Sequence, residues 1–308
     1  MRKKSQANTE ASSAAPTTDN RQPATIKIGG VPEHFNLPIH LAKEKKQFEK
    51  RGVNVEWVTF GGGTGQMTQA LRDGTVDICI LLTEGIITDI ANGNPSKIIS
   101  EYVTTPLTWG IHTGAKNTLR HYDEIYDKKY AISRFGSGSH LMAIVDANSN
   151  GHNLQREQFH VIKDIKGALE SLEKLESDVF YWEKFTTKPY VDAGKLRRVG
   201  EYRTPWPCFV MAATDKILAE QPENVIRVMR AVHDSADYFM RNDDAVKMVS
   251  ERYELQLKDV ERWYHTTEWA IHGWVRDKML KSVIYHLKLA GILEKNQEIP
   301  DLVWRRPE

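Results

Sequence analysis

Two glycine-rich turns are the first segments of this sequence whose residues suggest chemistry. The first, GGGTGQ at 61–66, lies between an alternating apolar run at 53–60 and a segment at 67–72 with helical character. The second, FGSGSH, lies at 135–140. Turns of this kind at a helix start direct backbone N–H groups, assisted by the helix dipole, at an anion or a polar ligand group. We expect two polar platforms that face each other across a cleft.

The composition is that of an ordinary globular protein with more than one core. The chain has 308 residues, of which 40% are hydrophobic and 27% charged, and a chain of this length usually forms two domains. Its 42 Lys and Arg residues balance 41 Asp and Glu residues, so no strong field attracts nucleic acid or an anionic membrane. Cys79 and Cys208 are too few for a disulfide framework or a thiolate zinc site. We expect no metal and no other cofactor.

Two features of the sequence bear on its compartment. No apolar run approaches the roughly 18 residues that a membrane helix needs, so we expect no membrane insertion. Residues 1–25 contain no Val, Ile, Leu, Phe, Tyr or Trp, which predicts a disordered tail because such a segment cannot offset its chain entropy by burial. No apolar h-region follows its basic start. We therefore expect a cytoplasmic protein, with a periplasmic or other extracytoplasmic location as the alternative if a signal was removed.

Strands and helices alternate along the first two thirds of the chain, which favours α/β units with mostly parallel sheets. Strands are expected at 26–29, 53–60, 76–82 and 97–103, with helices at 37–50 and 83–91. A second region begins near 109–114. From residue 215 onward the pattern is almost purely helical, with helices expected at 221–242, 243–253, 257–270 and 276–290.

Several short motifs occur in an order that resembles the type-2 periplasmic-binding-protein fold. They include IKIG at 26–29, FEKRGV at 48–53, GGT at 62–64, ALRDGTVDI at 70–78 and GSG at 136–138. Within that fold the chain is similar, over about residues 25–290, to the family that binds nitrate, alkylsulfonates, taurine and thiamine-pyrimidine precursors. The phrases VPEHF at 31–35, WEKFT at 182–186 and TPWP at 204–207 resemble a narrower branch of stand-alone fungal and bacterial proteins, labelled as possible thiamine biosynthesis proteins.

The resemblance implies two α/β lobes, each a mixed, mostly parallel sheet flanked by helices, with a ligand cleft between them. The first lobe would comprise 26–111 and 212–308, and the second would comprise 112–211. The helical C-terminal part would thus return to cover the first lobe. We expect the lobes to move about crossovers near 111–114 and 208–212.

The expected ligand site lies where the strands end, because ligands of open α/β sheets sit beyond the carboxyl ends of the strands. Aromatic side chains, histidines, carboxylates and small polar groups gather in these loops, and a mostly apolar site with a few convergent polar groups is typical of ligand binding. The predicted ligand-binding residues are Glu33, His34, Phe35, Asn36, Gly62, Gly63, Thr64, Gly65, Thr83, Glu84, Trp109, Ser137, Gly138, Ser139, His140, Trp182, Glu183 and Trp206.

Many of these side chains also have a purely structural alternative. His34 would otherwise be a solvated loop histidine, and Ser137 and Ser139 would cap a helix. Trp182 would pack in the core, and Trp206, between two prolines, would stiffen the hinge. Flat tryptophan faces suit an aromatic or cationic ring, whereas the glycine turns suit a carboxylate, sulfonate or phosphate. A small heteroaromatic ligand with an oxygen or amine substituent fits both.

A ligand-binding protein that closes by hinge motion is the function we expect, with no catalytic residue. The ligand would be a small heteroaromatic or anionic molecule, such as a thiamine-pyrimidine precursor or a sulfonate. An exported protein would deliver it to an ABC permease, and a cytoplasmic one would act as a carrier or sensor. The alternative is an enzyme similar to the thiamine-pyrimidine synthases of the family, although the sequence lacks their cysteine-rich iron-binding motif, since Cys208 stands alone.

Overall fold

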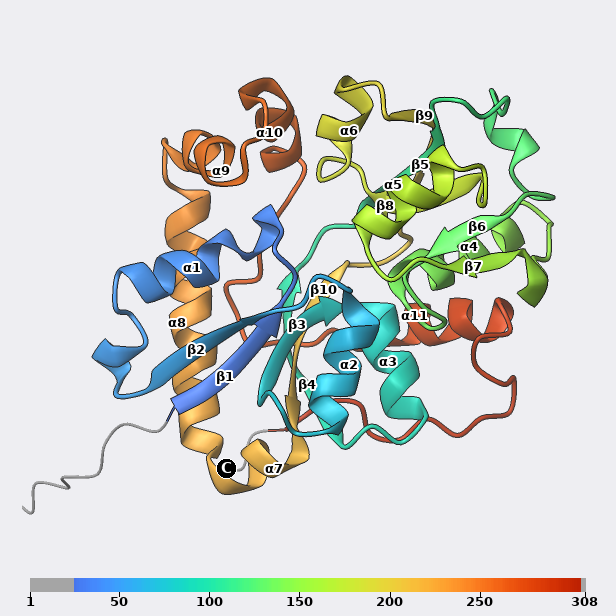
Figure 1. The fold of residues 1–308 in the computed structure, drawn as a ribbon. Helices are drawn as coiled ribbons and strands as arrows, with labels where there is room; N and C mark the ends of the chain where they lie inside the picture. Colours follow the sequence, from blue (N-terminus) through green and yellow to red (C-terminus); the bar gives the residue numbers. More distant parts are fainter. Residues whose placement is uncertain (1–24, 306–308) are drawn as a thin grey trace, which may run out of the picture.

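The computed structural model describes residues 25–305, and its strands form two separate sheets (Figure 1). The tail expected at 1–25 lies outside the described residues, apart from Thr25. The first sheet contains, in spatial order, β2 (Asn54–Thr59), β1 (Thr25–Gly30), β3 (Ile78–Leu82), β10 (Phe209–Thr214) and β4 (Ser96–Val103). In this sheet β1 pairs in parallel with β2 and β3, whereas β10 pairs antiparallel with β3 and β4.

The second sheet repeats this arrangement with later segments of the chain. Its spatial order is β7 (Phe159–Val161), β6 (Tyr130–Ile132), β8 (Val179–Glu183), β5 (Thr108–Gly114) and β9 (Leu196–Arg203). β6 pairs in parallel with β7 and β8, and β5 pairs antiparallel with β8 and β9. The predicted two-lobed α/β class with mixed sheets is confirmed. A smaller fraction of the strand pairs is parallel than predicted. The reason is that β5 and β10 each enter a sheet from the opposite lobe and run antiparallel to their neighbours.

Helices flank both sheets. In the first lobe α1 packs on α8 and α2 packs on α3, while α11 reaches both α3 and the second-lobe helix α4. Among the described residues no helix is long and apolar enough to span a membrane. The helices are α1 (Leu37–Glu44), α2 (Thr64–Arg72), α3 (Thr83–Ala91), α4 (Gly138–Ser149), α5 (Ile165–Glu173), α6 (Lys188–Asp192), α7 (Asp215–Glu220), α8 (Pro222–Met240), α9 (Ala245–Tyr253), α10 (Leu257–Tyr264) and α11 (Asp277–Leu289).

Two predicted helices are shorter in the structure. The helix expected at 37–50 ends at Glu44, because Lys46 adopts a left-handed conformation (φ 52°) and the Gln47 N–H bonds to the carbonyl of Ala42. This is the Schellman pattern of helix termination, with lysine where glycine is usual. The helix expected at 257–270 ends at Tyr264, since the following chain runs along the edge of β4 and Trp269 forms a bridge with Val103.

Two short segments connect the sheets. The chain leaves β4 and enters β5 through 104–107, and it leaves β9 and enters β10 through 204–208. Both crossings lie a few residues before the crossovers predicted at 111–114 and 208–212, which fall mainly inside β5 and β10. The predicted ranges fall inside strands because β5 and β10 pair with their neighbours as soon as the chain reaches its new sheet. The limits of the two lobes stay a prediction.

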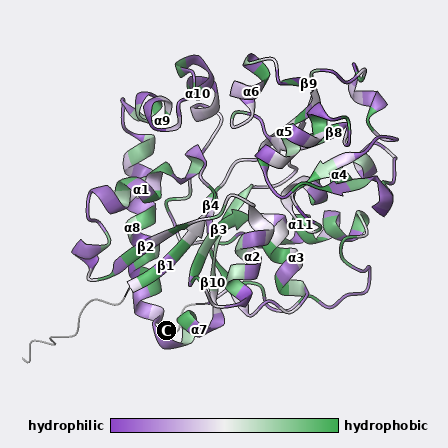
Figure 2. Ribbon diagram, viewed as in Figure 1, coloured by the Kyte–Doolittle hydropathy of each residue, from purple (hydrophilic) through white to green (hydrophobic). Residues whose placement is uncertain are grey.

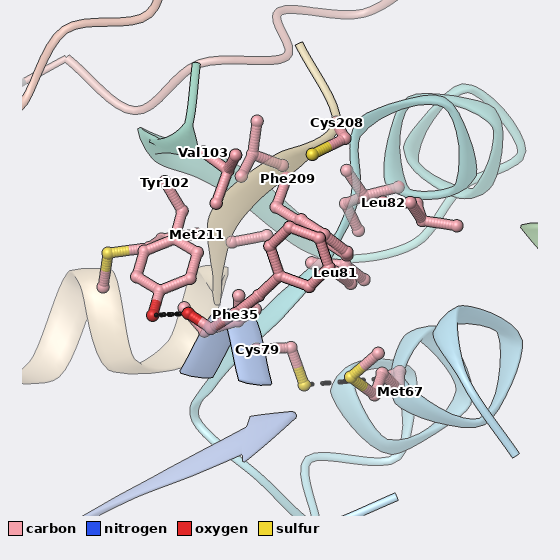
Figure 3. Packing of buried hydrophobic residues seen from close by; sticks show 14 of the residues in the cluster. Phe35, Met67, Cys79, Leu81, Leu82, Tyr102, Val103, Cys208, Phe209 and Met211 are labelled. Atoms are coloured by element: carbon pink, nitrogen blue, oxygen red, sulfur yellow. Dashed lines mark hydrogen bonds between the residues drawn. The ribbon is translucent and has the colours of Figure 1, made fainter. Parts of the chain in front are cut away.

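The first-lobe core fixes the loop that follows β1. Hydrophobic residues fill β3, which is buried along its whole length, whereas α8 contains both hydrophobic and hydrophilic residues (Figure 2). Figure 3 shows Phe35 of that loop among Leu81, Tyr102 and Phe209. The Tyr102 hydroxyl and the Trp269 indole N–H both donate to the Phe35 carbonyl, at 2.8 and 3.0 Å. The core thereby sets the position of the residues just before Phe35.

Candidate functional site

A cavity of about 440 Å³, its opening included, lies between the two lobes. Its position at the ends of β1, β3, β6 and β8 follows the rule for open α/β sheets. The lining residues are Val31, Glu33, Gly63, Thr64, Met67, Leu82, Leu107, Trp109, Ser133, Gly138, Ser139, Trp182, Glu183 and Phe209.

Two buried carboxyl groups face this cavity from opposite lobes. Glu33 follows β1 and is 8% exposed, and Glu183 is the last residue of β8 and is 3% exposed. The Trp182 indole N–H donates to Glu33 Oε1 at 3.2 Å and so joins the lobes across the cleft. Burial, with the nearby Glu183 carboxylate as a second cause, raises the pKa of Glu33 to about 8. Burial also raises the pKa of Glu183 to about 7.

The chain around Glu183 holds this carboxylate in place. Its Oε2 accepts from the backbone N–H groups of Phe185 and Thr186, at 2.9 and 2.6 Å, and from the Thr186 hydroxyl at 2.9 Å. These donors favour the charged form of Glu183 and lower its pKa, whereas burial raises it. Glu183 is therefore anchored through Oε2, and the described residues provide no hydrogen bond to its Oε1.

His34 turns away from this cavity although it follows Glu33 directly. Its ring packs edge-on against Trp263 (centroids 4.2 Å apart) and stacks on Phe35 (4.8 Å). Its Nε2 lies 3.9 Å from Glu183 Oε2 and has no hydrogen-bond partner. Burial lowers the pKa of His34 to about 3, so the ring is neutral at pH 7. It lines a neighbouring cavity together with α6 and α10 residues.

The two glycine-rich turns meet through an arginine that sequence reasoning missed. Arg134, just before the second turn, donates to the carbonyl of Gly62 at 2.6 Å. A Cβ atom added at Gly65 would lie 2.7 Å from Arg134 Cδ, so glycine is required there for this close approach. The one sequence signal for this residue is a basic side chain at the end of the strand near 130–133. The first turn is thus linked to the start of the second through the Arg134 side chain.

Hydroxyl groups of the turns bond mainly within the protein. Thr64 Oγ1 accepts from the Leu82 N–H at 3.2 Å, and Ser139 Oγ accepts from the Ser133 N–H at 3.1 Å. Ser137 caps α4 by accepting from the His140 N–H. The His140 ring accepts from the Gly136 N–H and packs on Phe135 and Phe159. The turns therefore form part of the cavity wall, but the polar groups named here are already bonded within the protein.

Another buried acid, Glu84, holds the crossing segment 204–208 against α3. The Trp206 indole N–H donates to Glu84 Oε2 at 2.9 Å, and the Thr83 hydroxyl donates to the Pro207 carbonyl at 2.8 Å. Burial raises the pKa of Glu84 to about 7. These residues therefore fix one connection between the lobes.

The structure brings about half of the predicted ligand-binding residues to the cavity. Those that line it are Glu33, Gly63, Thr64, Trp109, Gly138, Ser139, Trp182 and Glu183. Those that do not line it are His34, Phe35, Asn36, Gly62, Gly65, Thr83, Glu84, Ser137, His140 and Trp206. The apolar wall residues Val31, Met67, Leu82, Leu107 and Phe209 and the polar Ser133 were not predicted, because buried apolar side chains carry no signal that separates a cavity wall from a core.

Comparison with known proteins supports the fold. A family model described as Ca3427-like PBP matches residues 109–202. The Candida albicans CA3427 product, described as defining a new family with the generic periplasmic binding protein fold, superposes with a TM-score of 0.84. It is 27% identical, with 92% of this chain and 98% of that chain covered. A search of curated proteins found no match.

Two bacterial binding proteins share the fold at lower identity. The alkanesulfonate-binding protein SsuA from Xanthomonas axonopodis pv. citri, bound to MOPS, gives a TM-score of 0.76 at 17% identity, covering 93% of this chain and 100% of that chain. The nitrate-binding protein NrtA from Synechocystis PCC 6803 gives a TM-score of 0.67 at 16% identity, covering 88% of this chain and 83% of that chain. The chain therefore has the two-lobed periplasmic-binding-protein fold, and within it is similar to the Ca3427-like proteins.

Proposed function

We propose that this protein binds a small, flat molecule in the cavity between its lobes and closes on it by hinge motion. The observation that carries the proposal is the cavity itself, whose walls come from strand ends of both lobes and combine aromatic rings with two carboxyl groups. A largely apolar cleft with a few polar groups, placed where strands end, is the usual design of a small-molecule site.

The aromatic walls support a ring-shaped ligand. Trp109 and Trp182 line the cavity from the second lobe, and Phe209 lines it from the first. Phe180 stacks behind Trp182 with ring centroids 5.4 Å apart, which holds the indole plane in place. Flat rings fixed in this way favour a flat partner. A small heteroaromatic molecule, such as a pyrimidine precursor of thiamine, is the ligand class we propose, with a sulfonate as the alternative.

Contacts between the lobes support a hinge motion. Glu33 with Trp182 and Arg134 with Gly62 join the lobes near the cavity. Farther out, Lys188 of α6 lies 3.5 Å from Asp259 of α10. The Gln256–Asp192 hydrogen bond and the packing of α3 and α11 on α4 also join the lobes. Since two short segments connect the sheets, breaking these contacts would let the lobes part and admit a ligand.

The partner follows from the compartment. If the protein is exported, an ABC permease would receive the ligand, as expected for the import proteins that share its fold. If it stays in the cytoplasm, it would carry or sense the ligand. Within residues 25–305, no group of three or more His, Cys, Asp or Glu side chains is arranged so that it could hold a metal ion.

A thermal-shift screen tests the proposal. Purified protein is heated with pyrimidines, sulfonates, carboxylates and polyamines, and a true ligand at one hundred times its Kd adds about 2.7 kcal/mol to the free energy of unfolding. The Trp182→Ala protein should lose the shift. The control is Trp274→Ala, because Trp274 is 72% exposed and outside the cavity.

Recovery of the ligand separates binding from catalysis. A binder returns its ligand unchanged after denaturation, whereas an enzyme of the synthase type consumes it. The proposal fails if no compound shifts the melting temperature, or if Trp182→Ala responds to every compound as the unaltered protein does.

A further inference from the structure

The charge of the cavity distinguishes it from an anion site. Glu33 and Glu183 are its ionisable lining groups, and no Lys, Arg or His occurs among the described residues that line it. The rest of the wall is apolar, aromatic or made of small polar residues, of which Thr64 and Ser139 already bond within the protein through their hydroxyl groups. A sulfonate, nitrate or carboxylate placed here would meet two carboxyl groups and no cation.

Each carboxyl group retains an oxygen without a donor. Glu33 accepts from the Trp182 indole through Oε1, and Glu183 accepts its three donors through Oε2. Within residues 25–305 no donor is within hydrogen-bond distance of Glu33 Oε2 or Glu183 Oε1. Neither oxygen is among the fully buried side-chain atoms without a partner, so each keeps some accessible surface. The oxygens of a largely buried carboxylate need hydrogen-bond partners. A ligand that brings N–H groups and positive charge would supply them.

We propose that the ligand presents a planar cationic N–H group, such as an amidinium or a protonated amino-heterocycle, to Glu33 and Glu183, and that binding releases a proton from this pair. This inference rests on the proposed function and names the ligand class of that cavity. The O–H bond of one carboxylic acid breaks, its proton passes to the buffer, and the carboxylate accepts N–H···O bonds from the ligand. The ring of the ligand lies against the aromatic wall.

Four ionisable groups that neighbour the pair do not titrate between pH 6 and pH 9. Glu84, whose pKa burial raises to about 7, does titrate there, but it bonds to the Trp206 indole and does not line the cavity. His34, beside Glu183, is neutral because burial lowers its pKa to about 3. Tyr253, which acts on Glu33 through space, is neutral because burial raises its pKa to about 12. Arg198 stays charged and donates to the Lys184 carbonyl at 2.7 Å. Cys208 stays a thiol, because burial raises its pKa well above the usual value.

The sign of the pH dependence follows from the two carboxyl groups. Burial raises the pKa of Glu33 to about 8 and that of Glu183 to about 7, so the empty site holds protons at pH 6 and loses them by pH 9. A cation binds the ionised form better, and its affinity must therefore rise with pH. The affinity of a neutral ligand of the same shape should not rise in this way.

Three probes with one ring test the inference. Benzamidine is cationic throughout this range, benzamide is neutral and benzoate is anionic. Calorimetric titrations at pH 6 and pH 8, in buffers that differ in ionisation enthalpy, measure both affinity and proton release. We expect benzamidine to bind at least tenfold more tightly than benzoate at pH 8, and to tighten about tenfold from pH 6 to pH 8 as a proton is displaced.

Two variants locate the effect. Glu33→Gln and Glu183→Gln should each weaken benzamidine binding and reduce proton release, while the matched control Glu173→Gln, an exposed residue of α5 paired with Lys116, should change neither. If either variant does not fold, the pH series on the unaltered protein decides alone. Benzoate or a sulfonate binding more tightly than benzamidine, or a benzamidine affinity independent of pH, would overturn the inference.

The two proposals fail in different ways. If an anion binds and Trp182→Ala abolishes that binding, the protein is a cleft binder but its ligand is not cationic. If neither these probes nor the wider screen binds, the proposed function fails and this inference fails with it.

Discussion

The inner cavity and an outer groove of this protein differ sharply in charge. The inner cavity has two buried carboxyl groups and no basic side chain among its described lining residues. The groove, of about 1160 Å³ with its opening, carries five basic side chains against two acidic ones. It is lined by Pro106, Thr108, Lys184, Phe185, Lys188, Arg198, Glu201, Arg203, Asp259, Arg262 and Thr266.

The difference shows where recognition is expected. In the groove Lys188 lies 3.5 Å from the buried Asp259, and Lys184 pairs at 2.8 Å with Glu201, so several charges are already compensated, and the Lys184–Glu201 pair is partly exposed. Such pairs contribute little to stability. The carboxyl groups of the cavity have no compensating cation within the described cavity lining. Burial makes their ionised form unfavourable unless a ligand compensates the charge. We therefore expect the cavity to choose the ligand.

The largest effect is expected for Trp182→Ala. The change removes an aromatic wall of the cavity and the N–H donor on Glu33, and truncation of a buried tryptophan costs about 3–5 kcal/mol. Denaturant unfolding should show this loss, and ligand affinity should fall together with it. Trp274→Ala should stay within about 0.5 kcal/mol, as surface changes do. Equal losses in the two variants would mean that the cavity wall has no special role.

Glu33→Gln should make the protein more stable at alkaline pH. Since the folded-state pKa of Glu33 is raised to about 8 from an ordinary 4.5, its favourable contribution is complete below pH 4.5. It is lost as pH rises through 8. The variant removes that loss, worth on the order of 2–4 kcal/mol at pH 8.5 and little at pH 5. Melting temperatures of both proteins across this range give the measurement, and a constant difference would argue against a protonated Glu33.

Arg134→Ala should favour an open arrangement of the lobes. The change removes the bond to the Gly62 carbonyl, and a hydrogen bond to a charged group is worth about 1.5–3 kcal/mol. Small-angle X-ray scattering of the ligand-free protein should give a larger radius of gyration. Arg262→Ala, in the exposed groove, is the control and should scatter like the unaltered protein. Identical curves for all three would show that Arg134 does not hold the lobes together.

The smallest effect is expected in the groove. Lys184→Ala breaks a partly exposed ion pair with Glu201, which costs about 0–1 kcal/mol. Ligand affinity should change less than twofold, because the variant leaves the cavity intact. A loss of binding as large as that of Trp182→Ala would place recognition in the groove instead.

The sequence predicts the fold better than it predicts the site. The alternation of strands and helices predicts the α/β class, and the resemblance of the motifs to the type-2 periplasmic-binding-protein fold supplies the two lobes. It also places Glu33 and Glu183 correctly at strand ends. What it does not give is the direction of each side chain. His34 turns toward Trp263 because the core holds the Phe35 carbonyl with Tyr102 and Trp269.

Long-range contacts also explain the residues that the sequence does not reveal. Arg134 becomes important only because Gly62 of the other lobe lies within hydrogen-bond distance. Trp206 lies off the cavity because its indole donates to Glu84. Each contact joins residues more than seventy positions apart, so no local pattern contains it.

A calorimetric titration of benzamidine at pH 8 tests the central claim most directly. The account predicts one binding site per chain in the unaltered protein and no measurable binding to Trp182→Ala, whose groove residues are unchanged. Equal binding to both proteins would contradict it, because the ligand would then lie outside the cavity between Glu33 and Glu183.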